Sequence, residues 1–279
     1  MADRDAEQWV PLHSAHAIEQ FLFTLQFDRA IDEAAVKTIR DRLKDDAAFP
    51  AKNEIRTVGI EIGAGGGRAL LPASGVPTLS GMHYQKTRDD GTVETELKLD
   101  RTAIAFRTIA YTHWETVWGA AKQYVSIALP VYLTAGKLVV IGLNYVDKFI
   151  WQGALERASP LPILRPESKY LAPRVYGAKD LWHTHSGEFV SVDNQTKRLV
   201  NVDVDYVDEY PSDEPRRALV IKTVLNDAFN QFGYAPTALK AEAGMEFIGN
   251  QIIQLHDLCK DILGNIISSD MAKRIALEG

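Results

Sequence analysis

The sequence predicts an α+β protein of two similar halves, each a curved antiparallel sheet with a long helix across one face. Three observations lead to this fold class. Several stretches alternate apolar and polar residues with a period of two, which is typical of strands with one buried face. Two long stretches, 112–130 and 237–263, carry apolar residues at helical spacing. Each of these follows a run of strand-like segments, so the second part of the chain repeats the element order of the first.

The size and composition of the chain permit this arrangement. With 279 residues, 46% of them hydrophobic and 24% charged, the chain can form one large domain or two modest ones. We divide it into an N-terminal polar arm (1–13), a first half (14–133) and a second half (134–279). The alternative is a single larger α+β domain without a repeat.

The first half begins with a strand and a helix. From Ala17 to Phe27 the phenylalanines and Leu25 point to one face, and Gln20, Thr24 and Gln26 to the other. Asp32 is the predicted N-cap of a helix that ends before Pro50. Further strands are predicted at 55–62, 80–87, 92–99 and 102–110.

The first half ends with an amphipathic helix. Thr112-His113-Trp114-Glu115 is a capping-box pattern that opens it. Its apolar stripe contains Trp114, Trp118 and Tyr124, which we interpret as core residues and not as a platform for stacking nucleic-acid bases. Pro130 is predicted to stop it.

The second half begins with a strong strand at 137–145 and a short helical connection at 149–157. A proline-containing stretch at 158–174 is predicted to be irregular. Three strands follow at 182–190, 198–206 and 217–224. The long helix at 237–263 and a short one that starts at Ser268-Ser269-Asp270 complete the chain.

The cellular compartment is predicted from what the sequence lacks. Cys259 is the single cysteine, so no intrachain disulfide and no cysteine cluster can form, and we expect it to be a small core residue. Residues 1–10 contain no apolar run of signal-peptide length. The most apolar stretch, 124–143, is interrupted by Pro130 and by a polar turn, which does not suit a membrane span. We therefore expect a cytoplasmic protein without membrane association.

Three stretches resemble a sporadically distributed prokaryotic family of two-half α+β proteins that has no established activity. They are TELKLDRTAIAFRTIAYTHWETVW (95–118), VVIGLNYVDKFIW (139–151) and the C-terminal helices from 255 to 276. The chain departs from this family at Asn144, where arginine is common, and at Asp147, where asparagine is common. The resemblance implies the two-half fold and brings no reaction, cofactor or catalytic residue. Its sporadic occurrence is typical of accessory systems such as defence or toxin-immunity modules.

The glycine-rich stretch 63–68, GAGGGR, does not support phosphate binding. A P-loop needs a lysine followed by serine or threonine, and a dinucleotide fingerprint must open a helix. This stretch runs instead into Ala69-Leu70-Leu71-Pro72. We interpret it as a turn or loop.

Two histidines and two aspartates are the candidates for a metal site. His183 and His185 stand two apart in a predicted strand, so both imidazoles lie on one face of it. Asp203 and Asp205 share a face of another predicted strand. If the strands pair, the cluster supports a metal-assisted hydrolase with the two histidines as ligands. The alternative is two solvated strand faces, because a zinc site needs a third ligand and no metal signature accompanies these residues.

Asp203 and Asp205 are also considered as a carboxylate pair for acid–base chemistry. The alternating Val-Asp-Val-Asp pattern around them is more typical of a half-solvated strand. No catalytic residue is predicted on this basis.

The net charge of −6 disfavours nucleic acid as a partner. Arg107 belongs to a set of basic residues near one hairpin, but acidic neighbours make that surface mixed. The sequence therefore predicts a non-catalytic binding or regulatory protein, without a cofactor, that presents a sheet face or groove to a protein or a small ligand. A metal-assisted hydrolase and a nucleic-acid-binding protein remain the alternatives. The candidate binding residues are Asn144, Arg107, His183, His185, Asp203 and Asp205.

Overall fold

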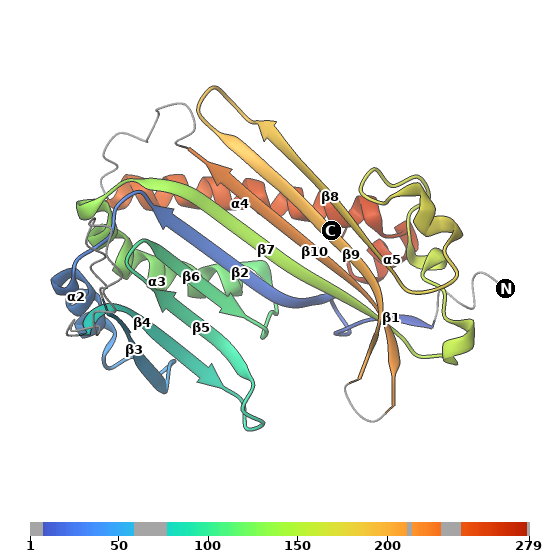
Figure 1. Ribbon diagram of the computed structural model, residues 1–279, viewed down its shortest axis with the longest axis horizontal. Coiled ribbons are helices and arrows are strands. Elements are labelled where there is room, and N and C mark those ends of the chain that lie inside the picture. The colour runs from blue at the N-terminus through green and yellow to red at the C-terminus, as the bar shows by residue number, and fades with distance from the viewer. Residues whose placement is uncertain (1–7, 59–76, 211–213, 230–240, 278–279) are drawn as a thin grey trace, which may run out of the picture.

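A computed structural model describes residues 8–58, 77–210, 214–229 and 241–277 of the chain. Its strands form one ten-stranded antiparallel sheet, with the order β3-β4-β5-β6-β2-β7-β10-β9-β8, and β1 pairs with β7 beside the end of β2 (Figure 1). The strands are β1 (Trp9–Pro11), β2 (Ile18–Phe27), β3 (Ala51–Thr57), β4 (Thr78–Thr87), β5 (Val93–Leu99), β6 (Ala103–Thr108), β7 (Leu138–Trp151), β8 (Trp182–Ser191), β9 (Lys197–Glu209) and β10 (Arg216–Ala228).

The helices all cover the same face of this sheet, behind the strands in Figure 1. They are α2 (Glu33–Leu43), α3 (Trp114–Ala135), α4 (Ala241–Ile266) and α5 (Ser269–Arg274). Three short 3₁₀ helices between β7 and β8 extend the cover: Leu155–Arg157, Leu161–Ile163 and Pro173–Gly177. The α+β class and the antiparallel pairing of the strands are thus as predicted, and the strands of both predicted halves belong to one sheet.

The core lies between the helices and the sheet because the strands alternate. Phe21, Phe23 and Leu25 of β2 are fully buried, as the period of two predicts. The ring of Phe21 lies edge-on to Trp114 and that of Phe23 edge-on to Trp118 of α3. The interpretation of the α3 aromatics as core residues holds for Trp118, which is 9% exposed.

Helix α3 corrects two predictions. Its N-cap is His113 and makes no side-chain hydrogen bond, so the predicted capping box does not form. Pro130 does not stop the helix, which continues to Ala135. The proline removes one backbone hydrogen-bond donor from the helix. The helical turn after it, however, buries the side chain of Tyr132 completely, and the Tyr132 hydroxyl donates to the carbonyl oxygen of Ala103 at 3.1 Å. This burial outweighs the lost hydrogen bond.

The connection after β7 corrects a further prediction. Residues 149–151 belong to the strand and not to a helix, and only 155–157 of the predicted helical segment form a 3₁₀ turn. Phe149 and Trp151 are buried against the helix layer, in phase with the preceding residues of the strand. The strand is long because both of its edges find partners.

The N-terminal arm also differs in part from expectation. Trp9 pairs with Trp151 across β1 and β7 and is fully buried, and its indole Nε1 donates to the carbonyl oxygen of Ser159 at 2.7 Å. Residues 9–11 are therefore part of the sheet.

The predicted starts of two helices and the predicted burial of the cysteine are confirmed. The side chain of Asp32 accepts a hydrogen bond from the amide of Ala35 at 2.8 Å and caps α2, although this helix ends at Leu43, before the predicted region. Ser268 caps α5. Cys259 is buried. The glycine-rich stretch 63–68 and the predicted start of the last long helix lie outside the described residues.

The second face of the sheet carries no helix of the described chain, and we call it the open face. It presents the residues of each strand that alternate with the core residues, such as Leu22 of β2 and Asn144 of β7. Among the described residues, no helix is long and apolar enough to cross a membrane. The prediction of a cytoplasmic location stays a prediction.

Candidate functional site

All six predicted site residues lie on the open face, in two groups. The register places Asn144 opposite Leu22, and Leu22 opposite Arg107, so the first group follows one row across β7, β2 and β6. His183, His185, Asp203 and Asp205 form the second group on β8 and β9. Arg107 and the histidines are separated by the central strands, so the six residues do not form one site.

The second group consists of two parallel histidine–aspartate pairs. Strands β8 and β9 pair as the hypothesis required, with His183 opposite Asp205 and His185 opposite Asp203. The Nδ1 atom of His183 lies 2.5 Å from a carboxylate oxygen of Asp205, and that of His185 lies 2.6 Å from Asp203. Each carboxylate thus orients an imidazole whose Nε2 atom is left for other contacts.

These pairs provide two ligands but not a complete metal site. Carboxylates that orient histidines through Nδ1 are common beside bound metals, because they fix the tautomer and turn Nε2 towards the ion. The described residues contain no group of three or more His, Cys, Asp and Glu side chains placed to hold a metal. The imidazoles are more than half exposed, at 59% and 53%. The arrangement therefore suits a surface contact or a weak two-histidine site better than a buried catalytic metal.

The first group includes a charged network that the sequence did not predict. Arg107 donates through Nε to Glu96 at 2.5 Å and through Nη1 to Gln20 at 3.1 Å, and His83 contacts the other oxygen of Glu96 at 2.7 Å. Burial alone would raise the pKa of Glu96, but the Arg107 guanidinium and His83 hold it below its usual value. The positive charge of Arg107 is thus neutralised within the face.

A second charged network lies on the open face at the far end of β7. The ammonium of Lys148 contacts Glu19 at 2.5 Å and Glu209 at 2.6 Å, and Arg216 contacts Glu209 at 3.1 Å. Burial lowers the pKa of Lys148, but the two carboxylates more than offset this and raise it above its usual value. The sequence contained a signal for this placement, since Lys148 is in phase with Asn144 along the strand.

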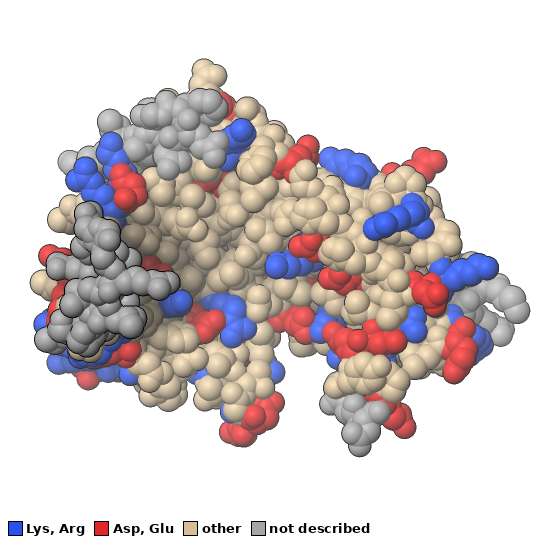
Figure 2. Space-filling view, viewed as in Figure 1, with Lys and Arg blue, Asp and Glu red and all other residues tan. Residues whose placement is uncertain are grey.

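The surface between the two networks is mostly aliphatic, with the exposed Lys222 of β10 as a charged residue within it. Half-buried aliphatic side chains from β2, β7 and β10 line it, namely Leu22, Val140, Val146, Val220 and Val224. The side chains of Thr24 and Asn226 lie over Gly142, where a β-carbon would overlap both. Figure 2 shows this side of the molecule, with a hollowed surface of mostly tan residues, a few charged side chains near its middle and more towards its borders. Asn144 stands in this region, and its Oδ1 atom is buried without a hydrogen-bond partner in the described chain.

A buried polar cluster on the opposite face of β7 was missed by sequence reasoning. Burial raises the pKa of Asp147 to about 7, and one of its oxygens has no hydrogen-bond partner among the described residues. Nearby, the hydroxyl of Tyr145 lies 3.0 Å from Nδ1 of His256, and His256 stacks on Trp114 with ring centroids 4.0 Å apart. Burial lowers the pKa of His256 to about 4. The position of Asp147, in phase with the buried Tyr145, was the signal that could have revealed it.

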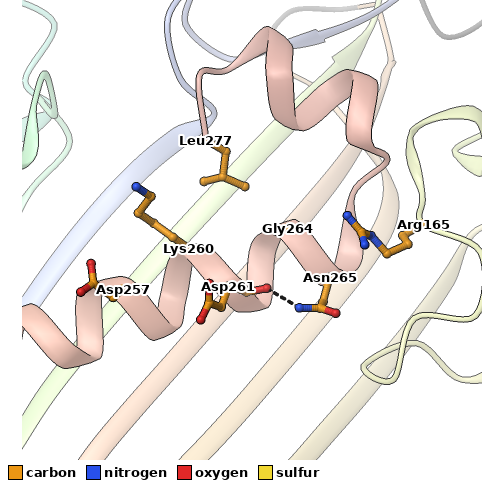
Figure 3. Close-up of a pocket in the computed structure, with 7 residues that line it drawn as sticks. All are labelled: Arg165, Asp257, Lys260, Asp261, Gly264, Asn265 and Leu277. Carbon is orange, nitrogen blue, oxygen red and sulfur yellow. Dashed lines mark hydrogen bonds between the residues drawn. The ribbon is translucent and has the colours of Figure 1, made fainter. Parts of the chain in front are cut away.

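A hollow of about 460 Å³ lies on the helix side, at α4 and α5 (Figure 3). Its lining alternates in charge, with Arg165 and Lys260 beside Asp257 and Asp261. Figure 3 shows Arg165 reaching in from the loop after β7 and the other three projecting from α4. This mixture of charges favours neither an anion nor a cation, and no predicted site residue belongs to it.

Comparisons of the chain with protein-family models, with curated proteins and with solved structures find no match. The resemblance of the three sequence stretches to a prokaryotic family therefore stays a prediction.

Proposed function

We propose that this protein is a non-catalytic binding protein that holds a protein partner on the open face of its sheet. One observation carries the proposal: the described helices cover one face, and the other presents half-buried aliphatic side chains across three central strands. A contiguous apolar surface bordered by polar residues is the common mark of an interaction site. The two charged networks provide such a border.

The shape and charge of this face favour a protein over other ligands. A small ligand is usually held in a concave pocket that buries most of it, whereas the half-buried aliphatic side chains of this face are spread over three strands, β2, β7 and β10. Nucleic acid requires a cluster of free cations, but Arg107 and Lys148 are both paired with carboxylates here, and the exposed Lys222 stands among aliphatic side chains. The net charge of −6 acts in the same direction.

The test uses a photo-crosslinking residue at Val224, in the centre of the open face. We expect it to capture one protein from a lysate of the native host, identified by mass spectrometry. The same residue at Ile253, which is 46% exposed on α4, is the matched control and is expected to capture none. Binding of that purified protein should then weaken at least about tenfold in Val224→Glu, because a carboxylate would be desolvated in an apolar contact.

The outcome that contradicts the proposal is equal capture at both positions, or unchanged affinity of Val224→Glu. Retention of a small molecule by the purified protein, displaced by the same substitution, would instead assign the face to a small ligand. Circular dichroism of Val224→Glu checks that the fold is intact.

We also propose that the two halves are copies of one structural unit. The strand order supports this. In each half the first strand lies beside the last, β2 beside β6 and β7 beside β10, and the remaining strands follow outwards in reverse chain order. Each half ends in a long helix, α3 or α4, and the first strands of the two halves meet in the middle of the sheet. The halves differ in strand number, since the first has β2 to β6 and the second β7 to β10, and in the connection between their first and second strands, which contains α2 in one and the 3₁₀ helices in the other.

A second candidate function is metal binding at His183 and His185, which is what the hydrolase alternative needs. The two oriented imidazoles favour it. We expect calorimetric titration with zinc chloride to show binding that is lost in the double variant His183→Asn/His185→Asn. Asp205→Asn should weaken it by about tenfold or more, since the orienting contact is removed.

The control for this titration is His113→Asn, which replaces an exposed histidine at a helix N-cap by a favourable capping residue. Zinc binding that persists in the double variant, or none by the unaltered protein, removes the metal hypothesis.

A further inference from the structure

Strand β8 is an edge of the sheet that pairs with no second strand in the described chain. It pairs only with β9, over all ten residues from Trp182 to Ser191. The one side-chain hydrogen bond to its backbone in the described chain comes from Arg174, whose Nη2 atom donates to the carbonyl oxygen of His183 at 3.2 Å. An edge of this length presents a row of backbone donors and acceptors that can pair with another strand. In Figure 1 it forms the border of the sheet opposite β3.

This edge has few of the features that normally prevent strand addition, namely the charge of Glu188 and the contact of Arg174 with His183. Natural edges are protected by lysines, prolines or a covering helix. The opposite edge, β3, has charged residues at Lys52, Glu54 and Arg56, and Glu54 is tied to α2 through Arg40 at 3.1 Å. The sequence of β8, WHTHSGEFVS, contains no lysine and no proline.

Apolar side chains are concentrated along the same edge. Eight large hydrophobic residues are exposed in the described chain, and four of them fall between 181 and 192: Leu181, Phe189, Val190 and Val192. Phe189 is 65% exposed. Half of the large hydrophobic residues exposed in the described chain therefore lie in or next to one strand, which points to a contact that buries them.

We propose that two copies of the chain pair through antiparallel β8 strands and join their sheets into one. Antiparallel self-pairing is the natural arrangement of a twofold dimer, because each residue contacts the same set on the other copy. A pairing centred on Ser186 puts Phe189 beside the second copy's His183, and Val190 beside the second copy's Trp182. Apolar and aromatic side chains then meet, and the charge of Glu188 lies opposite a neutral threonine.

The symmetry of this pairing has a consequence for the open face. A twofold axis perpendicular to the sheet leaves both open faces on the same side, so the dimer presents one surface twice as wide. The contact is that of a single strand, about 33 Å long. It buries less than a standard stable interface, and we expect a reversible dimer with a Kd of about 10–100 µM.

The experiment is sedimentation velocity of the full chain over a concentration range that brackets this Kd. We expect a monomer–dimer equilibrium for the unaltered protein. Ser186→Lys and Ser186→Glu should each be monomeric. Residue 186 of one copy lies opposite residue 186 of the second copy at the twofold axis, and two like charges repel each other there. An equimolar mixture of the two variants should restore the dimer, since opposite charges then meet.

The control Ile253→Lys introduces the same charge on an exposed position of α4 and should dimerise as the unaltered protein does. A monomer at every concentration overturns the proposal. So does dimerisation of both Ser186 variants, or a mixture that stays monomeric while each variant keeps its circular dichroism spectrum. Partner capture through Val224 does not depend on the result, so this inference and the proposed function can fail separately.

Discussion

Replacing Asp147 by asparagine is expected to stabilise the protein at pH 8 by about 2–4 kcal/mol and to change little at pH 4. Burial raises the pKa of Asp147 from 3.8 to about 7, so the folded state keeps a proton that the unfolded state has released. As the pH rises from 4 towards 7, unfolding is therefore favoured progressively. Above that range the cost is constant, and an asparagine side chain, which does not ionise, avoids it.

The groups around Asp147 do not supply a compensating positive charge. Tyr145 precedes it on the same strand, Tyr111 faces it from the loop before α3, and Cys259 faces it from α4. Burial raises the pKa of the tyrosines and of the cysteine, so all three stay neutral near pH 7. The carboxylate charge is thus opposed by desolvation alone.

His256 affects the same measurement in the opposite direction. Burial lowers its pKa from 6.5 to about 4, so its contribution to stability is present above pH 6.5 and is lost as the pH falls towards 4. In the unaltered protein, the pH dependence of stability that comes from Asp147 therefore opposes the one that comes from His256. Urea unfolding at several pH values should therefore show stability that rises with pH in Asp147→Asn and falls with pH in His256→Gln. A pH dependence of Asp147→Asn parallel to that of the unaltered protein would contradict the assignment.

Replacing Arg198 by methionine is expected to destabilise the fold by about 3–5 kcal/mol. Arg198 and Asp227 stand opposite each other on β9 and β10, and the guanidinium donates to both carboxylate oxygens, at 2.7 and 2.8 Å. The side chain of Asp227 is fully buried. Removing the arginine leaves that carboxylate without its partner in a place that water does not reach.

The control for this prediction is the double variant Arg198→Met/Asp227→Leu. Because an apolar pair of similar volume is often as stable as a buried ion pair, the double variant should recover most of the loss. Urea unfolding of the single and double variants measures both values. A cost below about 1 kcal/mol for Arg198→Met would mean that the pair behaves as a surface salt bridge.

The candidate site was predictable one residue at a time but not as an arrangement. The spacing of His183 and His185 placed both imidazoles on one strand face, and the same reasoning applied to Asp203 and Asp205. That each histidine meets one aspartate depends on the register of β8 against β9, which the side-chain pattern alone does not fix. Glu96 and Gln20 lie far from each other in sequence, so only the sheet brings both to Arg107.

The sequence by itself determined the features that depend on neighbouring residues. The alternation from Phe21 to Phe27 identified a strand and its buried face, and Asp32 and Ser268 identified two helix starts, because these signals act within one turn or one pleat. The tertiary structure alone decided what depends on distant contacts. Helix α3 continues through Pro130 because packing of Tyr132 outweighs one lost hydrogen bond, and β7 continues to Trp151 because strands on both sides pair with it. Local propensity is worth a fraction of a kcal/mol for most residues and about 3 kcal/mol for an interior proline, whereas burial of each large side chain contributes about 1.5–3 kcal/mol. The burial of several side chains, such as Leu129 and Tyr132 beside Pro130, therefore prevails where the two disagree.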